Sequence, residues 1–248
     1  MTNVRPMPTG PIAAEDRADP FTMTLFHSAL RRDLTRARLL LGDPGLSVRR
    51  RRRLGRHLQW TMAQLRWHHE GEDHSLWPVL LERDPASRVV LDAMEAEHEL
   101  LDGPLLALEA AARGLVADRA TPADALAALD ELEGPLLAHL SHEESAGLVI
   151  VRRVLSHREW REFEKRAWID GYTVADTLRF LRWIADGVRW RPDLVRRFGL
   201  PTALYWPVLK PLARSARCPG LTVWSGTPAA RIPSAAGSPS TSTSTSTS

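Results

Sequence analysis

The chain has 248 residues, of which 44% are hydrophobic and 25% charged, and its formal net charge is +3. This length accommodates one substantial domain with an appendage. No run of 18 apolar residues occurs, and the first 20 residues are charged and proline-rich, so neither a membrane-spanning helix nor a secretory signal is expected. Cys218 is the single cysteine and excludes an internal disulfide framework, and we therefore expect a cytoplasmic protein.

The charge divides the chain near residue 160. Residues 161–248 contain 13 Lys and Arg against 6 Asp and Glu, whereas residues 1–160 are net acidic. The composition predicts a disordered leader at residues 1–21 and a disordered, low-complexity Ser/Thr tail at residues 233–248. The sequence between these two segments is predicted to be helical almost throughout.

Four long helices are predicted in the first part of the chain. Apolar residues recur every three or four positions at 22–41, 47–82, 86–115 and 121–156. The turn Gly42-Asp43-Pro44-Gly45 stops the first helix, and Thr121 followed by Pro122 is a helix-start signal. Long helices with short connections favour an all-α fold, an up-down-up-down antiparallel four-helix bundle at residues 22–156.

Each of the four predicted helices carries one histidine that is a candidate for the bundle interior. These histidines are His27, His68, His98 and His139. Three of them are followed by a carboxylate four residues later, and residues four apart share a helix face. The three carboxylates are Glu72, Asp102 and Glu143. Three helices therefore offer an imidazole and a carboxylate to one side.

The spacing of these residues repeats between the two halves of the predicted bundle. His27 and His98, His68 and His139, and Glu72 and Glu143 are each 71 residues apart. The stretch HHEGED at 68–73 also matches HLSHEE at 139–144 in its first histidine, its fifth-position Glu and its sixth-position acid. Two helical hairpins that face each other across a pseudo-twofold axis would give this repeat. We expect all four histidines at one level of the bundle core.

The donor set indicates a metal site. Imidazole nitrogens with carboxylate oxygens suit iron, manganese or zinc, and the absence of thiolates argues against a structural zinc site of the cysteine type. Four histidines with two or three carboxylates exceed the needs of one tetrahedral ion. The pattern therefore predicts two metal ions bridged by carboxylate.

The stretches that carry these residues are FHSALRRDL, HHEGED with WP three residues later, EAEHELL and HLSHEE, within about residues 22–156. Together they resemble the hemerythrin-like HHE cation-binding family. The resemblance implies a non-haem di-iron centre, two irons per chain with carboxylate or oxo bridges, and dioxygen, peroxide or nitric oxide as the small ligand. The iron ligands that it implies are His27, His68, Glu72, His98, His139 and Glu143.

The chain departs at one position from the pattern of the oxygen-carrying hemerythrins that it resembles. Those proteins have a second histidine four residues after the third-helix histidine, and this chain has Asp102 there. We keep Asp102 as a seventh candidate ligand, with a solvated acid as the equal alternative, because the adjacent Gly103-Pro104 pair can distort the helix. Reversible oxygen carriage is therefore not expected.

The remaining histidines are given less specific roles. His69, His74 and His142 are predicted to point elsewhere on their helices, where each is solvated or supports a ligand from outside. His57 and His157 are predicted to lie at the surface.

The run Arg49–Arg53 raises the hypothesis of nucleic-acid binding, since clustered guanidinium groups neutralise phosphates. Five consecutive arginines radiate around a helix, however, no aromatic residue interrupts them, and the surrounding domain is net acidic. We therefore expect a solvated first helical turn and no nucleic-acid partner.

Residues 157–232 are predicted to form a helical, Trp- and Arg-rich C-terminal extension, with helices at 160–167, 174–188 and 202–213. Its tryptophans are Trp160, Trp168, Trp183, Trp190, Trp206 and Trp224. The favoured interpretation is a cap whose tryptophans pack on the bundle or on each other. The alternative is a docking surface for a protein partner, because exposed Trp and Arg are typical binding anchors. A membrane partner is not expected.

Two functional classes remain open at this point. In the first, the di-iron centre acts on or senses oxygen, peroxide or nitric oxide, for instance by breaking down peroxide, and iron supplies Lewis acidity and electrons. In the second, the chain is an iron-binding or regulatory interaction module without turnover, and metal occupancy stabilises its fold. A metal-free structural bundle is a third, minor interpretation.

Overall fold

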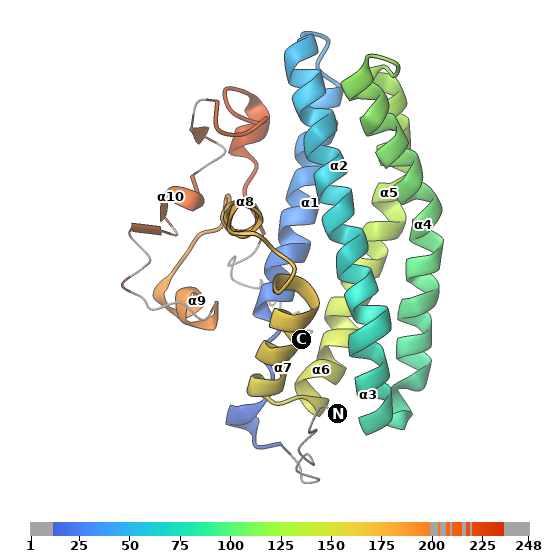
Figure 1. The fold of residues 1–248 in the computed structure, drawn as a ribbon, viewed down its shortest axis with the longest axis vertical. Coiled ribbons are helices and arrows are strands. Elements are labelled where there is room, and N and C mark those ends of the chain that lie inside the picture. Colours follow the sequence, from blue (N-terminus) through green and yellow to red (C-terminus); the bar gives the residue numbers. More distant parts are fainter. Residues whose placement is uncertain are drawn as a thin grey trace, which may run out of the picture.

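The computed structural model describes residues 12–198, 203, 207–208, 210–214, 217–218 and 220–235. These residues are largely helical and form no strand, which confirms the predicted all-α fold class. Figure 1 shows the four long helices side by side along the long axis of the molecule. They are α1 (Phe21–Leu41), α2 (Val48–Gly71), α4 (Arg88–Ala117) and α5 (Pro122–His142).

Each long helix packs against two others. Helix α2 contacts α4, α4 contacts α5, α5 contacts α1, and α1 contacts α2. The buried face of α4 shows why: its buried residues recur at alternating spacings of three and four, the stripe that a helix needs to face a core. The main members of this stripe are Leu91, Met94, His98, Leu101, Leu105, Leu108, Ala112 and Leu115.

The helix ends follow the local signals of the sequence. The Ser47 hydroxyl accepts a hydrogen bond from the Arg50 amide at the start of α2, and Thr121 forms a reciprocal capping box with Asp124 at the start of α5. Pro104 lies inside α4, and the helix continues through it to Ala117. The break that we considered at Gly103-Pro104 is therefore absent.

Two of the long helices continue through a π-helical turn into a short α-helix. After α2 come η2 (Glu72–Leu76) and α3 (Trp77–Arg83), and after α5 come η4 (Glu143–Gly147) and α6 (Leu148–Val154). In each turn the backbone carbonyl of the first residue accepts a hydrogen bond from the amide five residues later. The Trp77 amide donates to Glu72 in η2, and the Leu148 amide donates to Glu143 in η4. Turns of this kind are rare and are frequently found at functional sites.

Shorter elements complete the described chain. They are η1 (Ala14–Asp16), η3 (Pro85–Ser87), α7 (His157–Glu164), the π-helical η5 (Lys165–Ile169), α8 (Val174–Ala185), α9 (Pro192–Arg197), α10 (Lys210–Leu212) and η9 (Pro228–Arg231). None of the described helices is long and apolar enough to cross a membrane.

The N-terminal segment before α1 is packed from at least Ala18 onward. Ala18 is buried, and its amide donates to the carbonyl oxygen of Leu155 at 2.9 Å. This part of the expected leader therefore lies against the chain that follows α6. The expected disorder of residues 1–11 and of most of the Ser/Thr tail falls outside the described residues.

The C-terminal extension packs on the bundle through its tryptophans. Trp183, Trp190 and Trp224 are buried in the same hydrophobic cluster as the leucines of the four long helices, and Trp160 is buried in a second cluster with Trp77. This is the packing of a cap. Trp206 lies outside the described residues.

A network of charged side chains also joins the extension to α1, and we call it the arginine network. Its members are Arg32, Asp33, Arg36, His57, Trp183 and Asp186. The Asp33 carboxylate lies 2.9 Å from Arg32 Nη2, accepts from Trp183 Nε1 at 2.8 Å, and lies 2.6 Å from His57 Nε2. His57, which was expected at the surface, is half-buried, and its ring pairs with a buried carboxylate.

The arginine run at the start of α2 also holds the extension. Arg50 Nη2 donates to the carbonyl oxygen of Ser225 at 3.1 Å, and Arg53 Nη2 donates to that of Gly220 at 3.0 Å. Arg51 pairs with Asp118 at the end of α4. Part of the run thus makes protein contacts, where a fully solvated turn was expected.

Candidate metal centre

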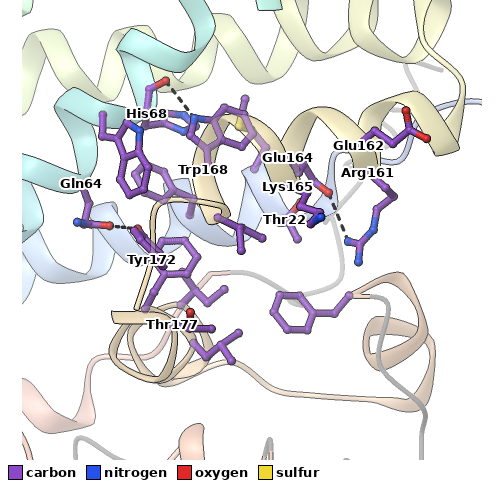
Figure 2. A pocket seen from close by; sticks show the side chains of 18 of the residues that line it. Thr22, Gln64, His68, Arg161, Glu162, Glu164, Lys165, Trp168, Tyr172 and Thr177 are labelled. Atoms are coloured by element: carbon purple, nitrogen blue, oxygen red, sulfur yellow. Dashed lines mark hydrogen bonds and ion pairs between the residues drawn. The ribbon is translucent and has the colours of Figure 1, made fainter. Parts of the chain in front are cut away.

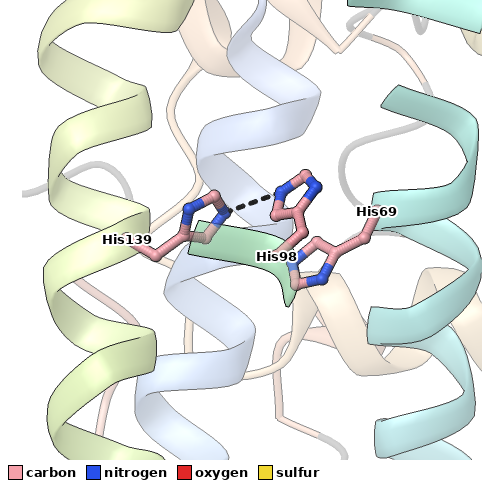
Figure 3. A group of neighbouring side chains, drawn as sticks. All are labelled: His69, His98 and His139. Atoms are coloured by element: carbon pink, nitrogen blue, oxygen red, sulfur yellow. Dashed lines mark hydrogen bonds between the residues drawn. The ribbon is translucent and has the colours of Figure 1, made fainter. Parts of the chain in front are cut away.

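Two groups of three buried side chains face each other inside the bundle. His27, His68 and Glu143 form one group, and in each group the potential ligand atoms lie within 4.8 Å of one another. His69, His98 and His139 form the other. Figure 3 shows this second group, in which α2, α4 and α5 each contribute one imidazole and the Nε2 atoms of His98 and His139 are 3.1 Å apart.

Two carboxylates span the two groups. Glu72 Oε1 lies 3.1 Å from His68 Nε2, and its other oxygen lies 3.6 Å from His98 Nε2. Glu143 Oε2 lies 3.0 Å from His27 Nε2 and 4.0 Å from His139 Nε2. Both carboxylates are therefore placed between one histidine of each group, as a bridge between two cations would require.

Seven donor atoms of this centre are buried but not hydrogen-bonded. The atoms without a partner are Nε2 of His27, His68 and His69 and both carboxylate oxygens of Glu72 and Glu143. A buried polar atom without a partner costs free energy, so such atoms are rare in folded proteins. Seven of them that converge on one place are explained by a cation, and the imidazole and carboxylate donors fit iron, manganese or zinc.

Carboxylates outside the centre fix the opposite nitrogens of three imidazoles. The Nδ1 atoms of His98, His139 and His27 lie 2.7, 2.9 and 3.0 Å from Asp73, Glu97 and Glu144 respectively. Such a partner sets the tautomer and the ring orientation and makes Nε2 more basic. These contacts leave the Nε2 lone pairs directed into the centre.

The π-helical turns deliver the two bridging carboxylates. Glu72 and Glu143 are the first residues of η2 and η4, and each side chain is fully buried. Gly147 leaves room for this, since a Cβ atom there would lie 3.2 Å from Glu143 Cγ. The 71-residue repeat of the sequence thus appears as two matching turns, one on each side of the centre.

Burial and charge shift the titration of these groups. Burial lowers the pKa of His68 and of His69 well below its usual value, and burial together with the Glu143 charge raises the pKa of Glu72 well above its usual range. Burial opposes charge on His27 as well, but attraction to Glu143 raises the His27 pKa to about 9. His68 and His69 are therefore held neutral, the form in which imidazole binds a metal.

The structure brings together six of the seven candidate ligands and leaves one apart. Asp102 is exposed and belongs to neither group, so the expectation that it shares the face of His98 is not met. The stripe on α4 runs from His98 to Leu101 and then Leu105, and position 102 falls just outside it.

His69 is the donor that the sequence pattern missed. Its ring is buried and stacks on His98 with ring centroids 4.0 Å apart, where we expected it to point elsewhere. The signal was present in α2, because Met62 and Gly55 lie one and two heptads earlier, respectively, and both are buried at the same helical position. His142 pairs with Glu97 outside the centre, and His74 and His157 are exposed.

Comparison with known proteins adds one finding. The family model described as the hemerythrin HHE cation binding domain matches residues 21–146, which include every member of the two groups. No curated protein and no solved structure matches the chain.

Proposed function

Because the chain belongs to the hemerythrin HHE cation-binding family, we propose that its cation site is a non-haem di-iron centre. The proposed frame is the up-down-up-down antiparallel four-helix bundle of residues 22–156, and the changes of chain direction in Figure 1 support it. Residues 157–232 would form the helical extension on this frame.

Two ions would share the donors between the two groups. His27 and His68 would hold one ion, and His69, His98 and His139 the other, with Glu72 and Glu143 between them. The observation that carries the proposal is the convergence of seven buried donor atoms without a hydrogen bond from two helices, α1 and α2, and two π turns. One tetrahedral ion would leave several of them unsatisfied.

The proposed function is to act on or sense oxygen, peroxide or nitric oxide. Iron, when bound, supplies Lewis acidity and electrons. The chain supplies neutral imidazoles, two carboxylates and a wall of buried leucines that excludes bulk water. The outer carboxylates would hold the imidazoles of His27, His98 and His139 in the orientation that directs Nε2 inward.

Metal analysis tests the stoichiometry. Protein from iron-supplemented expression is expected to contain about two irons per chain, as the capacity of the donor set requires. His69→Ala should lower the iron content, whereas the exposed His157→Ala, a matched control, should not. One zinc and no iron in the wild type would overturn the proposal.

A second candidate function is an iron-binding or regulatory module without turnover. The cap-like extension favours it, because metal occupancy would stabilise the fold on which the extension packs. Peroxide consumption by the iron-loaded protein separates the two functions. Turnover above that of free iron supports the first, and its absence with full iron content supports the second.

A further inference from the structure

A cavity of about 620 Å³ lies between the C-terminal extension and the bundle. Its bundle wall comes from α1 and α2, and its opposite wall from α7, η5, α8 and Phe198 (Figure 2). The opposite wall lies beyond residue 146, where the family match ends. The family match thus covers one wall of the cavity and leaves the other wall unaccounted for.

The cavity reaches the metal centre through His68. One face of the His68 ring stacks on Phe26, with centroids 4.2 Å apart, and Trp168 stacks at 5.0 Å. All three residues line the cavity. A molecule bound there would contact the immediate support of a candidate metal ligand.

Gly71 permits this arrangement of Trp168. A Cβ atom at Gly71 would lie 2.5 Å from Trp168 Nε1, too close for any side chain. The same Nε1 donates to the carbonyl oxygen of His68 at 3.4 Å. The indole can therefore cover His68 only because residue 71 has no side chain.

The lining is mainly aromatic and aliphatic. Six aromatic rings contribute, from Phe26, Trp67, Trp168, Tyr172, Phe180 and Phe198. Flat rings of this kind favour another ring in stacked or edge-to-face contact. Pockets that bury small molecules typically have this size and apolar lining.

The polar groups of the lining are paired with one another. Arg158 pairs with Glu162, Arg161 with Glu164, and Lys165 with Asp170 beside the cavity. The Tyr172 hydroxyl donates to Gln64, and the Thr22 hydroxyl donates to Glu164. Each of these charged side chains has an oppositely charged neighbour, so an ionic ligand would have to displace such a pair, and an uncharged ligand is favoured.

From this geometry we propose that the cavity is a binding site for a small uncharged aromatic molecule that rests against His68. Its existence does not require metal, since its walls are complete in the chain itself. The coupling to the centre rests on the proposed function, because it acts through His68.

Dye binding to metal-free protein tests the site. The neutral dye N-phenyl-1-naphthylamine should bind the wild type with increased fluorescence. Thr177 lines the cavity on α8, so Thr177→Phe fills it and should weaken dye binding by about tenfold or more. Val174→Phe places the same ring at the first residue of α8, which is 79% exposed and outside the lining, and should leave binding unchanged.

A second pair of variants keeps the test valid if Thr177→Phe does not fold. Leu181→Phe fills the same cavity one turn later, and Leu178→Phe is its exposed control. Failure of the wild type to bind the dye, or equal binding by a folded filling variant and its control, would overturn the proposal.

The coupling is tested with iron-loaded protein and benzyl alcohol, which does not absorb where the iron centre does. Benzyl alcohol should displace the dye and shift the near-ultraviolet absorption of the centre in the wild type but not in Thr177→Phe. Displacement without a shift would overturn the contact with the centre. Dye binding without any iron uptake would contradict the proposed di-iron function and leave the cavity site standing.

Discussion

The arginine network and the metal centre are both clusters of polar side chains within the protein, yet they satisfy their atoms in opposite ways. In the network, Asp33 meets Arg32, His57 and Trp183, and Arg36 Nε is its one atom among the unpartnered buried ones. In the centre, seven donor atoms make no hydrogen bond, although His27 Nε2 lies 3.0 Å from Glu143. Both clusters contain residues of α1 and α2. They differ because arginines lie beside the Asp33 carboxylate of the network, whereas no arginine among the described residues lies beside the carboxylates of the centre.

The pKa values express the same difference. Burial would raise the pKa of Asp33, but the adjacent Arg32 and His57 lower it below its usual range. Glu72 has no cation beside it, and burial raises its pKa well above its usual range. Asp33 has its cation supplied by the protein and holds the fold together, whereas Glu72 has none among the described residues and is available to a cation from solution; Glu143 lies between these cases, because its charge raises the pKa of the neighbouring His27 to about 9.

The largest effect is expected from breaking the network. Asp33→Ala would leave Arg32 buried without its counter-ion, and we expect a loss of about 3–5 kcal/mol in the free energy of unfolding. Asp130→Ala, which removes an exposed carboxylate paired with Arg38, should cost less than about 1 kcal/mol. Urea denaturation measures both. Equal costs for the two variants would show that the network does not hold the fold.

Removing metal should have the next largest effect. At free metal about 100-fold above its dissociation constant, the bound form is expected to be more stable by about 3 kcal/mol. His139→Ala should remove much of that difference, and His157→Ala should not. Thermal melting with and without chelator measures this. Identical melting temperatures for both forms of the wild type would contradict a buried metal centre.

Glu164 lies between these two cases: it pairs with an arginine, as Asp33 does, but its pKa is raised, as that of Glu72 is. Burial outweighs its pairing with Arg161 and raises the Glu164 pKa to about 7, above the 4.5 expected in the unfolded chain. Its contribution to stability is therefore full below pH 4.5 and is lost as the pH rises through about 7. Between pH 5 and 7 the wild type should lose about 2 kcal/mol relative to Glu164→Gln. Parallel stability curves for the two proteins would refute this.

The smallest effect is expected at Asp102. Because its side chain is exposed, Asp102→Ala should change stability by less than about 0.5 kcal/mol and leave the metal content unchanged. His69→Ala should lower the metal content, although the simple four-residue spacing favoured Asp102 over His69. A loss of metal from Asp102→Ala alone would reverse this assignment.

Periodicity was sufficient to predict the helices and most of the centre. The apolar spacing located α1 and α4 to within a few residues, because each must bury one stripe against its neighbours. The predicted helices 47–82 and 121–156 correspond to α2 with η2 and α3, and to α5 with η4 and α6. The same stripes contain His27, His68, His98 and His139. Asp102 was misplaced because four-residue spacing was applied where the stripe of α4 advances by three.

Other features left little signal in the sequence. His69 was set aside because neighbouring residues are about 100° apart on a helix, but α2 contacts both α1 and α4 and so buries a wider face. The π turns depend on a change of hydrogen-bond partner within a continuous helix, which local composition does not reveal. The cavity depends on how the C-terminal extension packs against the bundle. The tryptophans of the extension are irregularly spaced, so the sequence did not predict which face of each helix would pack on the bundle.

The π turns have a consequence for how this chain can vary in length. A π turn closes its hydrogen bond over five residues, where an α turn uses four. Deletion of one residue from η2 would therefore let the turn close as an α turn and leave α3, with the buried Trp77, near its present orientation. The histidines of α2 would keep their positions, because they precede the change. The same holds for η4 and the buried Leu148. Changes in length by one residue are therefore expected at these two turns as well as in the connections between helices.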